Sequence, residues 1–435
     1  MPFPDLGRTA QSAIYRAGTF GRRPKVPTDG AALEAAAAKV MSRRGFAYVA
    51  GSAGGEATAR ANREAFGRWR VVPRMLVDTG ERDLGVELLG RRHPSPLLVA
   101  PIGVLSAAHP DADLAVARAA REQEVTPILS TQASVPMEEV AAALCGTGHW
   151  YQLYWSSDDD LVASLVRRAE ACGSEAVVVT LDTAYLGWRP RDLDLGHLPF
   201  ARGEGLAQYT SDPVFRRLVE QRVAAKAQAE PEPQPRPTPA AVRTLVSLSR
   251  NHPGDIRHNL SAPEPRAAVE TFLDVFSRPS LSWADLPRLR ELTTLPVVLK
   301  GVLHPDDARR AVDEGVDGIL VSNHGGRQVD RSVAALDALP GVVDAVRFSG
   351  SDVPVLFDSG IRSGADVFVA LALGADAVGI GRPHVYGLAL GGAEGVSEVL
   401  RNITAELDLT MALTGCRTLA DITRDRLVEA PPLPH

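Results

Sequence analysis

A histidine and an arginine lie three residues apart in the run Ser-Asn-His-Gly-Gly-Arg-Gln at residues 322–328. This run follows four apolar residues, 318–321, that are typical of a buried parallel strand. His324 can take a proton near neutral pH, and Arg327 can hold a carboxylate through two parallel hydrogen bonds. These residue types predict an enzyme that binds an organic acid and removes a proton beside its carboxylate.

Short apolar stretches alternate with amphipathic helical segments along most of the chain. Eight stretches are predicted strands, at residues 97–101, 126–129, 150–154, 176–181, 296–300, 318–321, 353–357 and 377–380. Strands that are buried on both faces read as continuous apolar runs, and eight of them with intervening helices predict an α/β fold, the (β/α)8 TIM barrel. The alternative is an open doubly wound sheet, but no GxGxxG turn follows the early strands.

The 435-residue chain divides into three predicted parts. Residues 1–90 are expected to form an N-terminal helical extension, and residues 91–435 are expected to form the barrel. The strand spacing breaks once, between the fourth and fifth strands, where residues 190–280 are expected to form a lid over the barrel mouth. Within this insertion, residues 224–240 carry five prolines at alternate positions and are predicted to be disordered.

Composition excludes several other classes of protein. No apolar run approaches the roughly 18 residues of a membrane span, and the N-terminus has no segment of the signal-peptide type. The net charge of −6 gives no reason to expect a nucleic-acid partner. The three cysteines have no metal-ligand spacing, and their odd number argues against a disulfide framework. A cytoplasmic protein is the expectation.

Polar residues at the other strand ends predict a cofactor with a phosphate group. Barrels commonly hold phosphate with glycines and cations after strands seven and eight. The residues there are Asp358, Gly360, Arg362, Gly381 and Arg382. Ser130, Gln152 and Thr180 can hydrogen-bond the edge of a planar heterocycle. Lys300, one of only four lysines, can place a positive charge beside a ring that becomes anionic, so the set predicts a flavin mononucleotide (FMN) site.

The run at 322–328 resembles the signature of the FMN-dependent α-hydroxy acid oxidase and dehydrogenase family. The similarity extends from about Arg43 to Ile422, apart from the proline-rich segment. Three further stretches, at residues 48–56, 186–189 and 379–383, resemble the lactate 2-monooxygenase subgroup. This resemblance implies a homotetramer or homo-octamer that acts on a 2-hydroxy acid and O2.

The resemblance also implies roles for individual residues. His324 resembles the base and Asp182 its carboxylate partner, while Lys300 resembles the lysine beside the flavin. Tyr48, Tyr154, Arg189 and Arg327 resemble the residues that bind the substrate carboxylate and hydroxyl. The implied flavin contacts are Pro101, Ile102, Gly103, Ser130, Gln152, Thr180, Ser322, Asp358, Gly360, Arg362, Gly381 and Arg382.

Three positions depart from the common family pattern. Gly103 stands where many oxidases have alanine, and the extra space there favours a monooxygenase. Gln132 stands where glycolate oxidase has a bulky aromatic residue, and it is expected to line the pocket for the substrate side chain. Ala184 replaces a proline, which can shift the loop that carries Arg189.

The favoured hypothesis is therefore FMN-dependent oxidation of a lactate-like L-2-hydroxy acid by O2, followed by oxidative decarboxylation of the bound keto acid. The alternatives are an oxidase that releases keto acid and hydrogen peroxide, and a dehydrogenase that acts on a larger 2-hydroxy acid. A non-catalytic flavin-binding barrel is a fourth hypothesis, and the intact His324, Asp182 and Arg327 argue against it.

Overall fold

Eight parallel strands close into a barrel in the computed structural model, which describes residues 5–229 and 238–430. The strands are β4 (Leu97–Val99), β5 (Thr126–Leu129), β6 (Trp150–Leu153), β7 (Val177–Thr180), β8 (Val297–Val302), β9 (Gly318–Val321), β10 (Val355–Phe357) and β11 (Ala377–Ile380). They pair in chain order, and β11 pairs with β4 to close the ring. The predicted (β/α)8 barrel is confirmed, and the open-sheet alternative is excluded.

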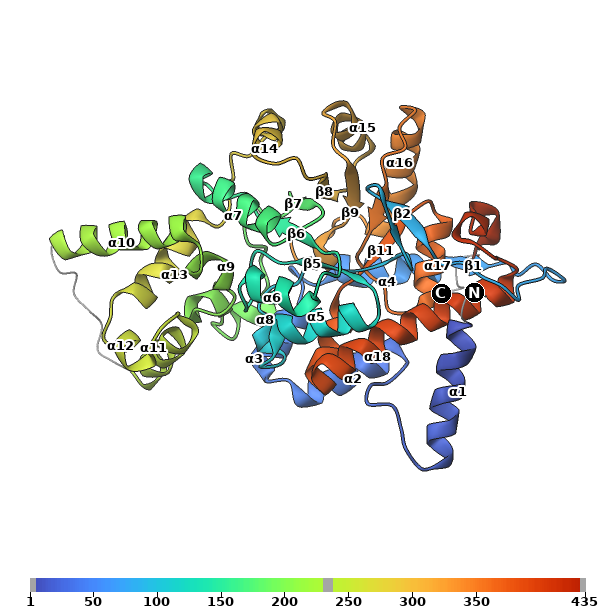
Figure 1. Cartoon of the computed structure of the whole chain (residues 1–435), viewed down its shortest axis with the longest axis horizontal. Coiled ribbons are helices and arrows are strands. Elements are labelled where there is room, and N and C mark those ends of the chain that lie inside the picture. The colour runs from blue at the N-terminus through green and yellow to red at the C-terminus, as the bar shows by residue number, and fades with distance from the viewer. Residues whose placement is uncertain (1–4, 230–237, 431–435) are drawn as a thin grey trace.

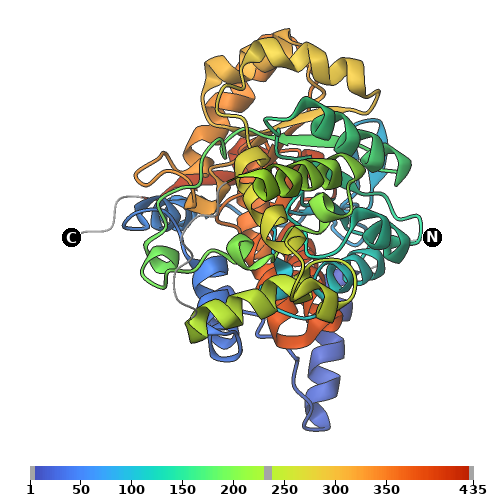
Figure 2. The ribbon, with the colours of Figure 1, turned by 90° about the vertical axis from the view of Figure 1, so that its left-hand side faces the viewer.

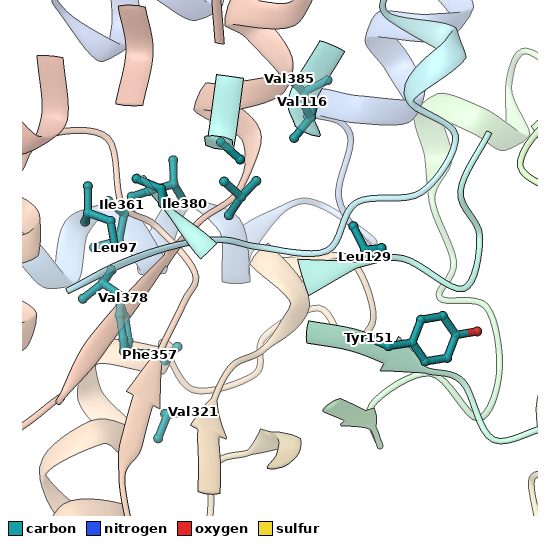
Figure 3. Close-up of a cluster of buried hydrophobic side chains, with 14 of the residues drawn as sticks. Leu97, Val116, Leu129, Tyr151, Val321, Phe357, Ile361, Val378, Ile380 and Val385 are labelled. Carbon is teal, nitrogen blue, oxygen red and sulfur yellow. The ribbon is translucent and has the colours of Figure 1, made fainter. Parts of the chain in front are cut away.

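Helices surround the barrel (Figure 1). Those that follow individual strands are α5 (Ala112–Glu122), α6 (Met137–Leu144), α7 (Asp159–Ala171), α15 (Pro305–Asp313), α16 (Ala335–Phe348), α17 (Gly364–Ala372) and α18 (Arg382–Thr414). Their apolar faces pack against the outward side chains of the strands and form the larger part of the core. Figure 3 shows a portion of this layer, which includes Leu97 of β4, Val116 of α5 and Val385 of α18.

The barrel interior holds two layers of side chains, a lower apolar layer and an upper layer that is mostly polar. One apolar residue from each strand forms the lower layer, namely Leu98, Ile128, Trp150, Val178, Val298, Leu320, Leu356 and Ala377. Successive side chains alternate between the faces of a strand, so the residue two positions later points to the same side. That rule gives the upper layer, which is Ala100, Ser130, Gln152, Thr180, Lys300, Ser322, Asp358 and Gly379. The strands therefore bring mostly polar groups together at their C-terminal ends.

The N-terminal segment is more than a helical extension. It contains α1 (Leu6–Thr19), α2 (Gly30–Val40), α3 (Arg43–Ala50) and α4 (Ala57–Gly67), and also two short strands, β1 (Trp69–Val71) and β2 (Val86–Leu88), the second of which pairs with β3 (Arg91–His93) just beyond the segment. The prediction missed these strands because each is three residues long. β1 pairs with β12 (Leu427–Glu429), and Leu88 of β2 packs against the lower apolar layer of the barrel.

The insertion after β7 is mostly helical. Its helices are α8 (Pro190–Leu193), α9 (Ala207–Thr210), α10 (Pro213–Gln228), α11 (Pro239–Asn251), α12 (Ile256–Asn259) and α13 (Glu264–Val275), followed by α14 (Leu286–Leu292). α10 to α13 lie at the end of the molecule opposite to β2 in Figure 1 and in front of the barrel in Figure 2.

The predicted disorder over 224–240 is wrong at both ends of that stretch. α10 continues to Gln228, and α11 begins at Pro239, where proline is favourable at the first position of a helix. Residues 230–237 lie outside the described residues. No helix in the described ranges is both long and apolar enough to cross a membrane.

Candidate active site

The turn after β9 holds His324 in a backbone conformation that is uncommon for residues other than glycine. Its φ angle is +57°, and Gly325 follows with a φ of +64°. Two serine hydroxyl groups fix this turn. Ser322 Oγ accepts a hydrogen bond from the His324 N–H at 3.0 Å, and Ser359 Oγ accepts one from the Gly325 N–H at 3.0 Å. Such strain persists only where surrounding contacts hold it, which is typical of functional sites.

A pair of asparagine side chains supports the same turn from the N-terminal segment. Asn62 of α4 and Asn323 exchange two amide hydrogen bonds, of 2.8 and 2.7 Å. Asn323 Oδ1 also accepts a hydrogen bond from the Gly326 N–H at 3.1 Å. The N-terminal helices therefore help to position the catalytic turn.

His324 and Asp182 form a pair whose side chains are 16% and 13% exposed. The distance from His324 Nδ1 to Asp182 Oδ1 is 2.8 Å, which leaves Nε2 as the ring nitrogen without this contact. Burial lowers the pKa of His324, and the Asp182 charge opposes this effect only in part. The imidazole is therefore neutral at pH 7 and able to take a proton. Once His324 is protonated, the Asp182 carboxylate stabilises its charge.

Lys300 supplies a buried positive charge beside this pair. Its Nζ lies 3.4 Å from Asp358 Oδ2 and 4.0 Å from Asp182 Oδ2, and it donates a hydrogen bond of 2.8 Å to Ser322 Oγ. Burial lowers the pKa of Lys300, but the two carboxylates raise it more, so it stays above its ordinary value. Burial likewise raises the pKa of Asp182, and the charges of protonated His324 and of Lys300 outweigh that effect and hold it well below its usual range.

A chain of side-chain hydrogen bonds crosses the upper layer of the barrel. Ser130 Oγ donates to Gln152 Oε1 at 3.0 Å, and Gln152 Nε2 donates to Thr180 Oγ1 at 2.9 Å. All three side chains are buried. The chain fixes the orientation of the Gln152 amide and leaves hydroxyl and amide groups that can bind the edge of a planar ring.

Four arginines line the cavity above this layer, and none has a carboxylate partner closer than 4.0 Å in the part of the chain that the structure describes. They are Arg189, Arg327, Arg362 and Arg382. Burial, together with the nearby Arg327 charge, lowers the pKa of Arg189 to about 10. Burial also lowers the pKa of Arg382 to about 10. Cations that lack a close carboxylate partner are suited to bind anions.

The cavity has a volume of about 910 Å³, part of which is open to solvent. Most of the predicted site residues line it, namely Tyr48, Pro101, Ile102, Gly103, Gln132, Tyr154, Arg189, Lys300, His324, Arg327, Asp358, Gly360, Arg362, Gly381 and Arg382. Ser130, Gln152, Thr180 and Ser322 belong to the upper layer of the barrel instead. Asp182 lies behind His324 and lines a second cavity, of about 1260 Å³.

The expected extra space at Gly103 is not present. A Cβ atom on Gly103 would lie 2.8 Å from the Cβ and 2.9 Å from the carbonyl oxygen of Gln132. The Gln132 carbonyl also accepts a hydrogen bond from the Val104 N–H at 2.9 Å, so it cannot move away freely. Glycine is therefore required here by close backbone packing, and the argument from Gly103 for a monooxygenase fails.

We expect the Gly103→Ala variant to lose about 1 to 3 kcal/mol of the free energy of unfolding, because the added methyl group overpacks this contact. Chemical denaturation of the FMN-free protein measures the loss. Gly67→Ala is the control, since a Cβ at Gly67 meets no atom within 4 Å. An unchanged free energy of unfolding for Gly103→Ala would show that the Gln132 loop can shift at little energetic cost.

The residues around the cavity fit FMN. Arg362 and Arg382 follow β10 and β11 and offer positive charge for a phosphate, and Gly381 leaves open space where a Cβ would lie. The hydrogen-bonded chain through Gln152 fits a heterocycle edge. Lys300 offers a positive charge at the same level of the barrel.

Comparison with known proteins agrees with this fit. Residues 37–429 match the family model described as FMN-dependent dehydrogenase. The chain belongs to this family. It is therefore an FMN-dependent oxidoreductase of 2-hydroxy acids, and the prediction of FMN is confirmed.

Individual members of the FMN-dependent dehydrogenase family resemble the chain over nearly its whole length. An FMN-dependent alpha-hydroxy acid dehydrogenase of Penicillium citrinum is 42% identical over 426 residues, which cover 98% of this chain and 96% of that one. L-lactate oxidase of Lysinibacillus sphaericus is 39% identical over 91% of this chain and 92% of its own. A structure of mandelate oxidase with (S)-4-hydroxymandelic acid is 37% identical, covers 93% of this chain and 99% of its own, and has a TM-score of 0.74.

Several residues that hold the site together escaped the sequence analysis. Asn323 and Gln328 were within the quoted run, but nothing in the sequence assigned them partners. Gln328 Oε1 accepts a hydrogen bond from Arg189 Nη2 at 2.8 Å, and its Nε2 donates to the Asp182 carbonyl at 2.8 Å. Asn62 lies in an ordinary helical sequence 261 residues before its partner Asn323 and carried no signal.

Proposed function

We propose that this member of the FMN-dependent dehydrogenase family oxidises an L-2-hydroxy acid to the 2-keto acid and uses O2 as electron acceptor. The observation that carries the proposal is the joint arrangement of a neutral His324, its partner Asp182 and arginines with no carboxylate closer than 4.0 Å around one cavity. L-lactate oxidases among the similar proteins support O2 as acceptor.

Each side chain has a defined task in this reaction. Arg327 and Tyr48 hold the substrate carboxylate, with the Arg327 guanidinium 5.0 Å from the centroid of the Tyr48 ring. Tyr154 lies beside the substrate hydroxyl and stays protonated, because burial raises its pKa to about 12. His324 Nε2 takes a proton from the substrate. FMN, when bound in this cavity, would supply the acceptor for the two electrons of the substrate.

Decarboxylation of a retained keto acid is the second candidate function. The guanidinium groups of Arg189, which is buried, and Arg327, which is partly exposed, favour it, because they can hold the carboxylate of the product in the cavity. The insertion between β7 and β8 is proposed to act as a cover that slows product release. Gly203 and Gly205 in this insertion pack closely, and a Cβ on Gly205 would lie 3.0 Å from the Gln132 carbonyl oxygen.

The decisive experiment begins with anaerobic addition of L-lactate and larger L-2-hydroxy acids to the yellow holoenzyme. We expect loss of the oxidised flavin absorbance, and its return on admission of O2. A holoenzyme that stays oxidised with every acid contradicts the proposed function. Product analysis then separates the candidates, since one hydrogen peroxide and one keto acid per O2 indicate an oxidase, whereas carbon dioxide and a shortened acid indicate decarboxylation.

A further inference from the structure

Gln132 is a buried residue whose backbone N–H and carbonyl both form hydrogen bonds, whereas its side-chain Nε2 forms none among the described residues. Its N–H donates to Ser130 Oγ at 3.1 Å, and its carbonyl accepts from the Val104 N–H at 2.9 Å. The residue is 6% exposed and lines the cavity that His324 and Arg327 also line. Its Nε2 is buried and has no hydrogen-bond partner among the described residues.

The other buried glutamines of the chain show that this is unusual. Gln152 uses both ends of its amide, which contact Ser130 and Thr180. Gln208 also uses both ends, since Oε1 accepts from the Met137 N–H at 2.9 Å and Nε2 donates to the Val135 carbonyl at 3.3 Å. Buried amides in proteins are normally paired in this way. Of these three glutamines, Gln132 is the one that lines the cavity, so a ligand bound there can complete its amide.

The position of Gln132 favours the substrate over FMN as that ligand. Ser130 lies in the upper layer of the barrel, where the hydrogen-bonded chain offers its groups to the flavin ring. Gln132 comes two residues after Ser130 in the chain. It lies next to the insertion between β7 and β8, where Gly205 packs against its carbonyl. Gln132 therefore lies beyond the upper layer of the barrel, next to the insertion.

We propose that the substrate is a 2-hydroxy acid whose side chain carries a hydrogen-bond acceptor, such as an amide or ketone carbonyl, that binds the Gln132 amide. This inference rests on the proposed function and adds the chemical class of the substrate side chain. A hydrocarbon side chain would leave the buried amide unpaired, and sites built to hydrogen-bond a substrate group discriminate strongly against analogues that lack it.

Shape-matched acids test this preference. (S)-2-hydroxysuccinamate and (S)-2-hydroxy-4-methylpentanoate differ in that an amide replaces an isopropyl group of similar shape, and a second pair is one methylene longer. In at least one pair we expect kcat/KM for flavin reduction to be about 10- to 100-fold higher for the amide. Equal values, or a preference for the hydrocarbon in both pairs, would overturn the inference.

Substitution of the amide should remove the preference. Gln132→Met keeps the approximate length of the side chain and is expected to bring the ratio for the matched pair close to one, with FMN content unchanged. Gln221→Met, at an exposed position of α10, is the control and should keep the wild-type ratio. A Gln132→Met variant that keeps the wild-type ratio contradicts the inference, and one that loses FMN shows that the amide serves the flavin.

Binding measurements on the wild-type holoenzyme keep the test independent of that variant. The matched 2-keto acids perturb the flavin spectrum when they bind, and the amide-bearing keto acid should bind about 10-fold more tightly or better. Failure of every acid, L-lactate included, to reduce the flavin would count against the proposed function. Reduction by L-lactate and by the hydrocarbon acids without any preference for the amides would count against this inference alone.

Discussion

Flavin reduction by a 2-hydroxy acid should fall by roughly 10⁴-fold in the His324→Ala variant. The imidazole is the neutral base nearest to Asp182 and Lys300, and alanine leaves no group at this point that can take the substrate proton. FMN should remain bound, because the arginines after β10 and β11 and the polar upper layer of the barrel are unchanged. Anaerobic stopped-flow measurement of the flavin absorbance gives the rate.

His304→Ala is a matched control for this substitution. His304 is exposed, and its Nδ1 accepts a hydrogen bond from the Asp306 N–H at the start of α15. Its loss should leave the rate of flavin reduction unchanged. Normal reduction in His324→Ala would refute the role of His324 as the base.

The wild-type rate of flavin reduction should fall at low pH but stay constant at moderately high pH. Burial places the pKa of His324 below its ordinary value, so the base is neutral at pH 7 and loses activity only as the pH falls through that lowered pKa. Lys300, whose pKa is raised above its ordinary value, and Tyr154, with a pKa of about 12, stay protonated well above neutral pH. We therefore expect a rate that is flat from about pH 7 to about pH 9.

The second large effect is expected for Asp182→Asn, which should slow flavin reduction by about 10²- to 10⁴-fold. Asparagine has the shape of aspartate but lacks the charge that stabilises protonated His324. Loss of the Asp182 charge also leaves Asp358 as the remaining carboxylate neighbour of Lys300. Stopped-flow reduction again measures the effect.

The pH profile tells this role from a purely structural one. The Asp182 charge raises the pKa of His324 against the effect of burial, so its removal should move the acid limb of the profile to lower pH. Asp307→Asn is the control, because Asp307 is an exposed carboxylate that lines the second cavity beyond Asp182. An acid limb that stays in place in Asp182→Asn would mean that the carboxylate does not act on His324 electrostatically.

The barrel and the types of residue at its mouth could be predicted from the sequence. Strands buried on both faces need continuous apolar runs, so β5, β9 and β11 have the predicted bounds. The C-terminal ends of parallel strands meet at one end of a barrel, which is why residues as distant as Lys300 and Asp358 could be assigned to one site. A local pattern was sufficient for these features because each depends on residues close together in the chain.

Pairings between distant segments could not be predicted in the same way. The Asn62–Asn323 amide pair joins two segments 261 residues apart, and nothing at either position indicates the other. The strands β1 and β12 are each three residues long, and they form because they pair with each other. Their stability comes from the pairing itself, so the separate sequences carry little signal.

By itself, the sequence determined the barrel and the residue types at its mouth, since strand period and residue type are local properties, and the resemblance to a known family added FMN. Only the tertiary structure decided what Gly103 and Gln132 do. Gly103 looked like added space, but the fold fills that space with the Gln132 backbone. Gln132 was expected to line the substrate pocket, and the fold adds that its Nε2 is buried without a partner among the described residues. Free space and unpaired groups depend on every neighbouring segment at once, so they exist only in the folded molecule.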